Sequence, residues 1–215
     1  MNVVGIIQAR MNSARLPGKV MMSIHGTPML LIMYERARYS KLIGHLIVAT
    51  SINKTDEPIA MLCKLNRMNC FRGNLDDVLD RFYQASTLFN PDHIVRLTGD
   101  CPLIEAEIID KTIEHHIKGG FDYTRNYGYP DGWDTEVMTK QALDIAYRNA
   151  SSSYEREHVT PYFYLHPELF KLGKYSNDHD LSYLKLSVDT EEDFFKVSRL
   201  IDLCLASTLE IHRNI

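Results

Sequence analysis

Several kinds of protein are excluded by what this 215-residue sequence lacks. No stretch approaches the 18 or more apolar residues of a membrane helix, and the N-terminal apolar run is too short for a signal-peptide core. The four cysteines, Cys63, Cys70, Cys101 and Cys204, form no CxxC pair, which predicts reduced thiols. The histidines show neither HxH nor HExxH spacing, so no zinc site is indicated. We therefore expect a cytoplasmic protein that does not contact a membrane.

An excess of positive charge is also lacking. The chain has 24 Lys and Arg against 28 Asp and Glu, a net charge of −4, which argues against a general nucleic-acid binder. The charge is uneven, because residues 1–41 hold six Lys or Arg and a single Glu. A basic first segment on an acidic body suits a small anionic ligand that is held locally.

Apolar runs of strand length alternate with helical patterns over the first half of the chain. Strands are expected at 3–7, 45–50, 70–71 and 93–97, and helices at 27–39, 55–67, 75–88 and 105–117. Thr27 is expected to cap the first helix, with Pro28 at its first position. Four strand–helix units predict the doubly wound α/β class, a Rossmann-like three-layer α/β/α sandwich with a mostly parallel mixed sheet. Ligands in such sheets bind outside the carboxyl ends of the strands.

The pattern changes from residue 119 onward. Short strands are expected at 121–126, 136–138, 169–170 and 184–188, with helices at 140–149 and 154–165. A last helix is expected from Thr190 to about residue 205, with Asp193 as the acid at its third position. Because no long linker is present, we expect one domain over 1–215, made of an N-terminal region (1–118) and a C-terminal region (119–215).

The segment after the first expected strand is rich in cations and small polar residues. It reads Gln-Ala-Arg-Met-Asn-Ser-Ala-Arg-Leu-Pro-Gly-Lys over residues 8–19. Arginine forks and a lysine point charge suit phosphate oxygens, and small residues allow backbone N–H groups to approach them. The loop is neither GxxxxGK[ST] nor GxGxxG. A solvated basic loop is the alternative interpretation.

This segment resembles the signature of the sugar cytidylyltransferases, Arg-x-x-Ser-x-Arg/Lys-x-x-Pro-x-Lys, whose loop wraps the phosphates of CTP. The resemblance covers nearly the whole chain and is strongest to the spore coat polysaccharide biosynthesis type of this family. It includes the segments 71–82, 99–103, 156–161 and 188–193. It implies a fold of the nucleotide-diphospho-sugar transferase type.

The resemblance also implies roles for individual residues. Arg10 and Lys19 would be catalytic. The nucleotide would be bound by Ala9, Arg10, Asn12, Ser13, Arg15, Lys19 and Asp100, with the pyrimidine near Arg72, Gly73 and Asn74. A helix N-terminus decorated with acids is the alternative for the region of Arg72. The N-terminal region would then bind the nucleotide, and the C-terminal region the sugar and a second subunit.

Two aspartates far apart in the sequence follow expected strands. Asp100 comes after the strand at 93–97, and Asp189 after the one at 184–188. A triphosphate needs a hard divalent cation, and Mg²⁺ usually takes one or two carboxylates together with phosphates and waters. The resemblance implies that both aspartates hold Mg²⁺. The alternatives are a turn residue for Asp100 and a helix cap for Asp189.

Polar residues of the C-terminal region are candidates for sugar binding. They are Arg125, Asn126, Trp133, Asp134, Glu136, Arg156 and His158. An indole face beside polar acceptors suits a sugar, although the only tryptophan could equally cover the core. Arg156 and His158 could meet a substrate carboxylate or simply pair with Glu155 and Glu157.

These expectations combine into one activity. The chain would transfer CMP from CTP to an acidic or modified sugar for a surface polysaccharide and release pyrophosphate. It would depend on Mg²⁺, act as a homodimer and bind neither nucleic acid nor membrane. A metal-dependent glycosyltransferase is an alternative, although no DxD pair stands at Asp100. A non-catalytic nucleotide-sugar binder is the other.

Overall fold

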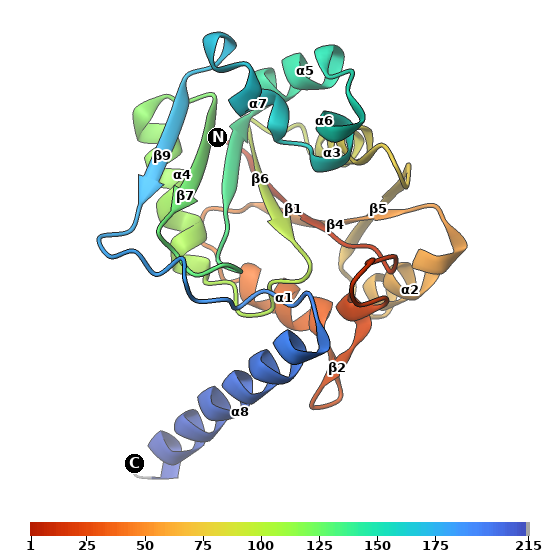
Figure 1. Ribbon diagram of the computed structural model, residues 1–215, viewed down its shortest axis with the longest axis vertical. Coiled ribbons are helices and arrows are strands. Elements are labelled where there is room, and N and C mark those ends of the chain that lie inside the picture. Colours follow the sequence, from red (N-terminus) through yellow and green to blue (C-terminus); the bar gives the residue numbers. More distant parts are fainter. Residues whose placement is uncertain (214–215) are drawn as a thin grey trace.

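The computed structural model describes the backbone of residues 1–213 and the side chains of residues 1–203. One seven-stranded sheet runs through it in the order β5-β4-β1-β6-β8-β7-β9 (Figure 1). The strands are β1 Val3–Gln8, β4 His45–Ser51, β5 Asn69–Gly73, β6 His93–Thr98, β7 Tyr123–Tyr127, β8 Glu136–Thr139 and β9 Leu172–Ser176. A two-stranded ribbon joins β2 Ser23–Ile24 to β3 Thr27–Pro28.

Helices cover both faces of the sheet. They are α1 Met29–Ala37, α2 Glu57–Leu65, α3 Val78–Thr87, α4 Ala106–Gly119, α5 Lys140–Asn149, α6 Ser153–His158, α7 Pro161–Leu165 and α8 Glu191–Arg213, with 3-10 turns η1 Lys19–Met21, η2 Lys54–Asp56 and η3 Pro167–Leu169. One core cluster joins the sheet to α1, α2 and α4, and a second joins it to α3, α5 and α7. None of the helices in the described portion of the chain has the length and apolar character to cross a membrane.

The first strand shows why the sheet is central. Val3 and Ile7 enter one core cluster, while Val4 and Ile6 enter the other. A continuous apolar run fits a strand that is buried on both faces. Strands β5, β4, β1 and β6 pair in parallel, and β8 then joins β6 antiparallel. The expected three-layer sandwich with a mostly parallel mixed sheet is therefore confirmed.

Three expectations about local structure are wrong in the C-terminal third. The expected helix at 154–165 is two helices, α6 and α7, because Val159 has a φ of 70° and Pro161 begins the second. Residues 169–170 are not a strand, since η3 ends at Leu169 and β9 begins only at Leu172. Residues 184–188 form an extended segment with a single bridge, between Lys185 and Asp131. Asp189 thus follows this segment and not a strand.

The start of the first helix also differs from the expectation. Thr27 and Pro28 form β3 against Ser23 and Ile24, so α1 begins at Met29 with Pro28 as its cap. Main-chain pairing in the ribbon takes the role expected of a Thr27 side-chain cap. The cap at the last helix is as expected, because Asp193 N donates to Thr190 Oγ1 (3.2 Å) and Thr190 N donates to Asp193 Oδ2 (3.0 Å).

After β9 the chain runs past the ends of the neighbouring strands toward the middle of the sheet. Figure 1 shows it running from β9 along the lower side of the molecule to α8, past the ends of the central strands. A third core cluster lies where it arrives. There Val188, Phe194 and Val197 pack against Leu16 and Met29. This packing brings the residues just before α8 to the loop after β1.

A buried histidine gives the fold a pH dependence that can be tested. His116 of α4 is fully buried, with Nδ1 2.9 Å from Thr124 Oγ1 and Nε2 3.2 Å from His93 Nδ1. Burial and the neighbouring His93 lower the pKa of His116 to about 3. The unfolded chain therefore takes up a proton below about pH 6.5 that the folded chain refuses until about pH 3. The free energy of unfolding should fall by about 2 kcal/mol from pH 7 to 5 through this group.

Denaturant unfolding at pH 7, 6 and 5 checks this expectation. In His116→Gln the decline over this range should become shallower by about 2 kcal/mol. The exposed His179 is the matched control, because His179→Gln should keep the wild-type slope. Equal slopes in all three proteins would contradict a neutral buried His116.

Candidate active site

A cavity of about 440 Å³ opens at the carboxyl ends of β1 and β6. Its lining comprises Gln8, Ala9, Arg10, Ser13, Ala14, Arg15, Lys19, Val20, Val78, Arg81, Arg96, Thr98, Gly99, Asp100, Glu157, His158 and Asp189. The loop after β1, the turn after β6 and the segment before α8 thus meet around one space. Ala9, Arg10, Ser13, Arg15, Lys19, Asp100 and Asp189, predicted from the sequence to act together, all belong to this lining.

A buried carboxylate, that of Asp56, fixes the conformation of the basic loop. Asp56 Oδ1 accepts a hydrogen bond from Met11 N at 2.7 Å, while its other oxygen accepts from Ser51 N at 3.1 Å. At the far end of the loop Gly18 has a φ of 75°, and its N–H donates to Met11 O at 2.8 Å. The left-handed conformation at Gly18 favours glycine. Asp56, which sequence reasoning missed, therefore positions the loop between Arg10 and Lys19.

Lys19 is the centre of the site. Its Nζ lies 2.6 Å from Asp100 Oδ2 and 3.0 Å from Asp189 Oδ1, and it donates to Val188 O at 2.8 Å. Residue 19 is buried, so its three donors are all used inside the protein. The cationic loop and the two distant aspartates thus converge on one ammonium group.

Main-chain contacts explain how the two aspartates come together. Val188 N donates to Asp100 O at 2.9 Å, which docks the segment before α8 on the turn after β6. That turn approaches β1 closely at Gly99, whose N–H donates to Gln8 O at 2.8 Å. A Cβ on Gly99 would stand 3.0 Å from the same Gln8 oxygen, so only glycine fits without a shift.

Asp189 is surrounded by cations. Arg15 Nη2 lies 2.9 Å from its Oδ1, and Lys185 Nζ lies 3.2 Å from its Oδ2. Burial raises the pKa of Asp189, but hydrogen bonds and charge from Lys19 and Lys185 outweigh it and lower the pKa below its ordinary value. Asp189 is therefore ionised at neutral pH and available to a cation.

The cavity carries more positive than negative charge. Five cationic side chains line it, Arg10, Arg15, Lys19, Arg81 and Arg96, against three carboxylates. Sequence reasoning missed two of the cations. Arg81 lies on the buried face of α3 and Arg96 in the middle of an apolar strand, and a charge in such a position is a signal that could have found them.

Glu136 is buried behind Arg96 and does not itself line the cavity. It forms an ion pair with Arg96 and accepts a hydrogen bond from Tyr123, while Arg96 Nε donates to Gln8 Oε1 at 2.7 Å. Burial raises the pKa of Glu136, but the charges of Arg96 and Arg125 and the Tyr123 hydrogen bond lower it overall. Glu136 thus holds Arg96 in place, and Arg96 and Gln8 face the cavity.

The residues predicted to contact the base lie outside the lining of this cavity. Arg72 donates from Nε to Ser51 O (3.0 Å), from Nη1 to Glu57 (2.6 Å) and from Nη2 to Asn53 O (3.2 Å). Asn74 Oδ1 accepts from the main chain of Asp76 and Asp77. Arg72, Gly73 and Asn74 therefore shape the loop before α3, and their contact with a base stays a prediction. Asn12 is exposed and also lies outside the lining.

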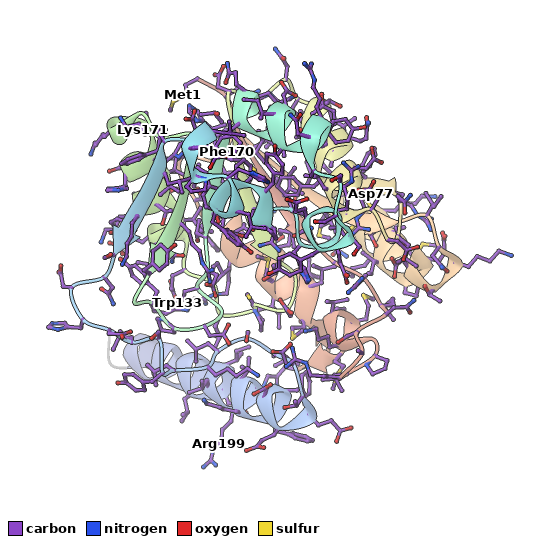
Figure 2. All side chains as sticks on the ribbon, turned by 45° about the horizontal axis from the view of Figure 1, so that its top comes forward. Met1, Asp77, Trp133, Phe170, Lys171 and Arg199 are labelled. Carbon is purple, nitrogen blue, oxygen red and sulfur yellow. The ribbon has the colours of Figure 1, made fainter. Side chains whose placement is uncertain are left out.

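The predicted sugar-binding residues are divided among several places. His158 lines the main cavity, whereas Arg125, Asn126 and Asp134 line a second one of about 220 Å³. Trp133 packs against the core, and Figure 2 shows it far from Asp77. Arg156 Nε lies 3.0 Å from both carboxylate oxygens of Asp77, so it joins α6 to α3 and pairs with neither Glu155 nor Glu157. Their binding of sugar stays a prediction.

The fold of this chain is shared with known proteins. The chain superposes with a TM-score of 0.74 on CMP:2-keto-3-deoxy-manno-octonic acid synthetase in complex with CTP, over 94% of this chain and 99% of that one. At 16% identity this likeness shows the fold, which is that of Rossmann-like nucleotidyltransferases. A cytidylyltransferase of Leptospira borgpetersenii superposes with a TM-score of 0.86 at 36% identity, over 90% and 84%.

Sequence comparison agrees with the superpositions. Spore coat polysaccharide biosynthesis protein SpsF of Bacillus subtilis is 35% identical over 206 residues, 93% of this chain and 86% of SpsF. The family model of cytidylyltransferases matches residues 4–213. The chain belongs to the cytidylyltransferase family. The resemblance inferred from the basic loop is therefore confirmed.

Proposed function

We propose that this protein transfers a cytidylyl group from CTP to a hydroxyl group of an acidic or modified sugar and releases pyrophosphate. The observation that carries the proposal is the convergence of Asp100 and Asp189 on Lys19 at the cavity, at 2.6 and 3.0 Å from Lys19 Nζ. A site with these charges suits a polyphosphate and its counter-ion. The name of SpsF supports a role in making a surface polysaccharide.

The donor set fits a magnesium ion carried by the triphosphate. Asp100 and Asp189 both lie within contact distance of one cation, the ammonium of Lys19. The described residues hold no cluster of three or more His, Cys, Asp or Glu side chains for a metal. Mg²⁺ accepts such a partial site, because phosphates and waters complete its six positions. When bound, the ion would neutralise phosphate charge and polarise oxygen.

The chain's own residues would then act by position and charge. Arg15 is two-thirds exposed at the mouth and, with Ser13, would hold the outer phosphates. Lys19 and Arg10 would offset the charge that grows on the α-phosphate and on the departing pyrophosphate. Binding both substrates in one cavity turns the attack of the sugar hydroxyl into an oriented step in line with the leaving group.

The acceptor sugar must reach the same cavity, since its oxygen attacks the α-phosphorus. Of the predicted sugar residues His158 lies there, beside Arg10 and Glu157, whose Nη2–Oε1 distance is 3.6 Å. Glu136 would act on the sugar indirectly, because it holds Arg96 in place at the cavity. We include in the proposal a homodimer formed through residues 119–215, no nucleic-acid partner and a cytoplasmic setting where CTP is made.

A screen for pyrophosphate release tests the proposal. Four nucleoside triphosphates are combined with a panel of octulosonic and nonulosonic acids, with and without Mg²⁺. We expect release with CTP, one sugar class and Mg²⁺. In a parallel incubation with a nucleotide-sugar, release of free nucleotide would instead indicate a glycosyltransferase. Binding of CTP with no turnover on any sugar would indicate a non-catalytic binder.

A further inference from the structure

Glu157 differs from the other two carboxylates of the cavity lining in its surroundings. Asp100 and Asp189 both contact the ammonium of Lys19, where the chain enters α8. Glu157 lies on α6, and its side chain is half-exposed. Among residues 1–203 its one ion-pair contact is with Arg10, where 3.6 Å separates Oε1 from Nη2, which is too long for a hydrogen bond. The carboxylate is therefore open to a ligand in the cavity.

The helix that carries Glu157 is firmly anchored. Ser152 and Glu155 form a capping box at its start, and Arg156 joins it to α3, with Nε 3.0 Å from both carboxylate oxygens of Asp77. Glu157 takes no part in these contacts. A titratable side chain that faces a cavity from a fixed helix, and that the fold itself does not use, is a candidate for a chemical role.

The backbone directly after α6 is strained. Val159 has a φ of 70° and a ψ of −54°, which a β-branched residue rarely adopts, and Thr160 N donates to His158 O at 2.8 Å. These values define a γ-turn of the rare, strained kind. Val159 is fully buried, so packing maintains the turn. Such strain collects at functional sites, and here it turns the chain away just after Glu157 and His158, the two residues of α6 that line the cavity.

We propose that Glu157 is the general base of the reaction and accepts the proton of the attacking sugar hydroxyl. The proposal rests on the function proposed above. The hydroxyl oxygen forms a bond to the α-phosphorus, the bond from that phosphorus to the bridging oxygen breaks, and pyrophosphate leaves with the bonding electrons. The proton passes to a carboxylate oxygen of Glu157, and from there to water after the product has left. A carboxylate accepts the proton of a substrate hydroxyl in the same way in protein kinases.

The position of Glu157 suits the direction of attack. Lys19 and the two aspartates lie toward the departing pyrophosphate, and the acceptor must approach the α-phosphorus in line from the other side. Figure 1 shows α6 and the first turn of α8 well apart, with the ends of β1 and β6 between them. Arg10, which would contact the α-phosphate, is the neighbour of Glu157. The carboxylate thus lies one side chain away from the reacting phosphorus.

Chemical rescue in the full chain tests the proposal. Pyrophosphate release from CTP and Mg²⁺ is measured with a mixture of octulosonic and nonulosonic acids, in sodium formate and in sodium chloride of equal ionic strength. The proteins are the wild type, Glu157→Ala, Glu157→Gln and Glu35→Gln, and calorimetry gives the CTP affinity of each. Glu35 is the matched control, because it also pairs with an arginine, Arg38 at 3.2 Å, but lies outside the cavity lining.

We expect both Glu157 variants to lose turnover by about 10²–10⁴-fold, while CTP affinity changes less than about threefold. Formate should restore part of the turnover in Glu157→Ala, because it can replace a missing base but not a missing structural contact. Glu35→Gln should keep the turnover of the wild type.

Three results would contradict the assignment. Equal losses of turnover and CTP affinity, with no rescue by formate, would show that Glu157 only positions Arg10. Full turnover in Glu157→Gln, with a loss in His158→Ala that imidazole restores, would move the base to His158. Either result would overturn this inference alone. No pyrophosphate release by the wild type with any of the acids would overturn the proposed function as well.

Discussion

Replacing Lys19 with methionine is expected to lower the rate of pyrophosphate release by about 10²–10³-fold. Lys19 is the one cation that contacts both Asp100 and Asp189 among the described residues, and it lines the cavity. In the reaction its charge would face the phosphates on which negative charge grows. A positioned charge in a water-poor site stabilises that change without reorganising solvent, so its removal acts mainly on turnover.

The same substitution also affects the free protein. Without Lys19 the half-buried carboxylates of Asp100 and Asp189 lose their shared donor, and the free energy of unfolding should fall by about 1–3 kcal/mol. Turnover is therefore measured well below the melting temperature of the variant. Saturating CTP separates the rate effect from weakened binding.

Lys185→Met is the control for Lys19→Met. Lys185 contacts the same Asp189 at 3.2 Å and Asp193 at 2.7 Å, but it lies outside the cavity lining. Its loss should change turnover by less than about fivefold, in line with the modest energies of partly exposed ion pairs. If both variants lost activity equally, the effect would come from the placement of Asp189, and a charge on Lys19 would not be needed for the reaction.

The central sheet could be predicted because its strands carry their own signal. Val3 to Ile7 is apolar at every position, which only a strand covered on both faces tolerates. The extended segment 184–188 misled the prediction because its apolar residues alternate with polar ones, as in a strand with one buried face. Leu186 and Val188 pack under α8, while the main chain forms two hydrogen bonds with Asp131 and one with Asp100. Contacts of this kind depend on loops far away in the sequence.

Some residues of the candidate site could be predicted from the sequence, and others could not. The loop of Arg10 to Lys19 stands out because its composition is unusual directly after a buried strand, and its joining to Asp100 follows from the sheet. Asp56, Arg81 and Arg96 were missed because each lies inside a regular element, and the sequence does not show which side of that element faces a site. Only the fold shows that all three serve one cavity.

The second large effect is expected for the two aspartates. Asp100→Asn and Asp189→Asn should each lower turnover at a fixed Mg²⁺ concentration by about 10²-fold or more, because each removes one of two carboxylates that the ion would use. Both side chains act on the same ion and the same lysine. The double variant should therefore be little slower than the weaker single variant.

Titration of turnover with Mg²⁺, and of Mn²⁺ binding in the presence of CTP, distinguishes a metal role from simple loss of charge. The Mg²⁺ concentration for half-maximal rate should rise in each single variant, and some of the rate should return at high Mg²⁺. Asp193→Asn is the control, because Asp193 accepts from Asp189 N at 3.0 Å and contacts Lys185 outside the cavity. An unchanged Mg²⁺ dependence in Asp189→Asn would remove Asp189 from the metal site.

The affinity for Mn²⁺ at falling pH gives an independent test of Asp189 as a metal ligand. Lys19 and Lys185 hold the pKa of Asp189 below its ordinary value despite burial, so this carboxylate stays available as the pH falls. Asp193 behaves in the same way. Burial raises its pKa, but Lys185 and the N–H groups of Asp189 and Thr190 outweigh burial and lower the pKa to about 2. Affinity for Mn²⁺ with CTP should therefore be flat from pH 8 to 6 as far as Asp189 is concerned. A carboxylate titrating near neutrality in the wild type, and absent from Asp189→Asn, would contradict the ionised, lysine-paired Asp189 on which the metal assignment depends.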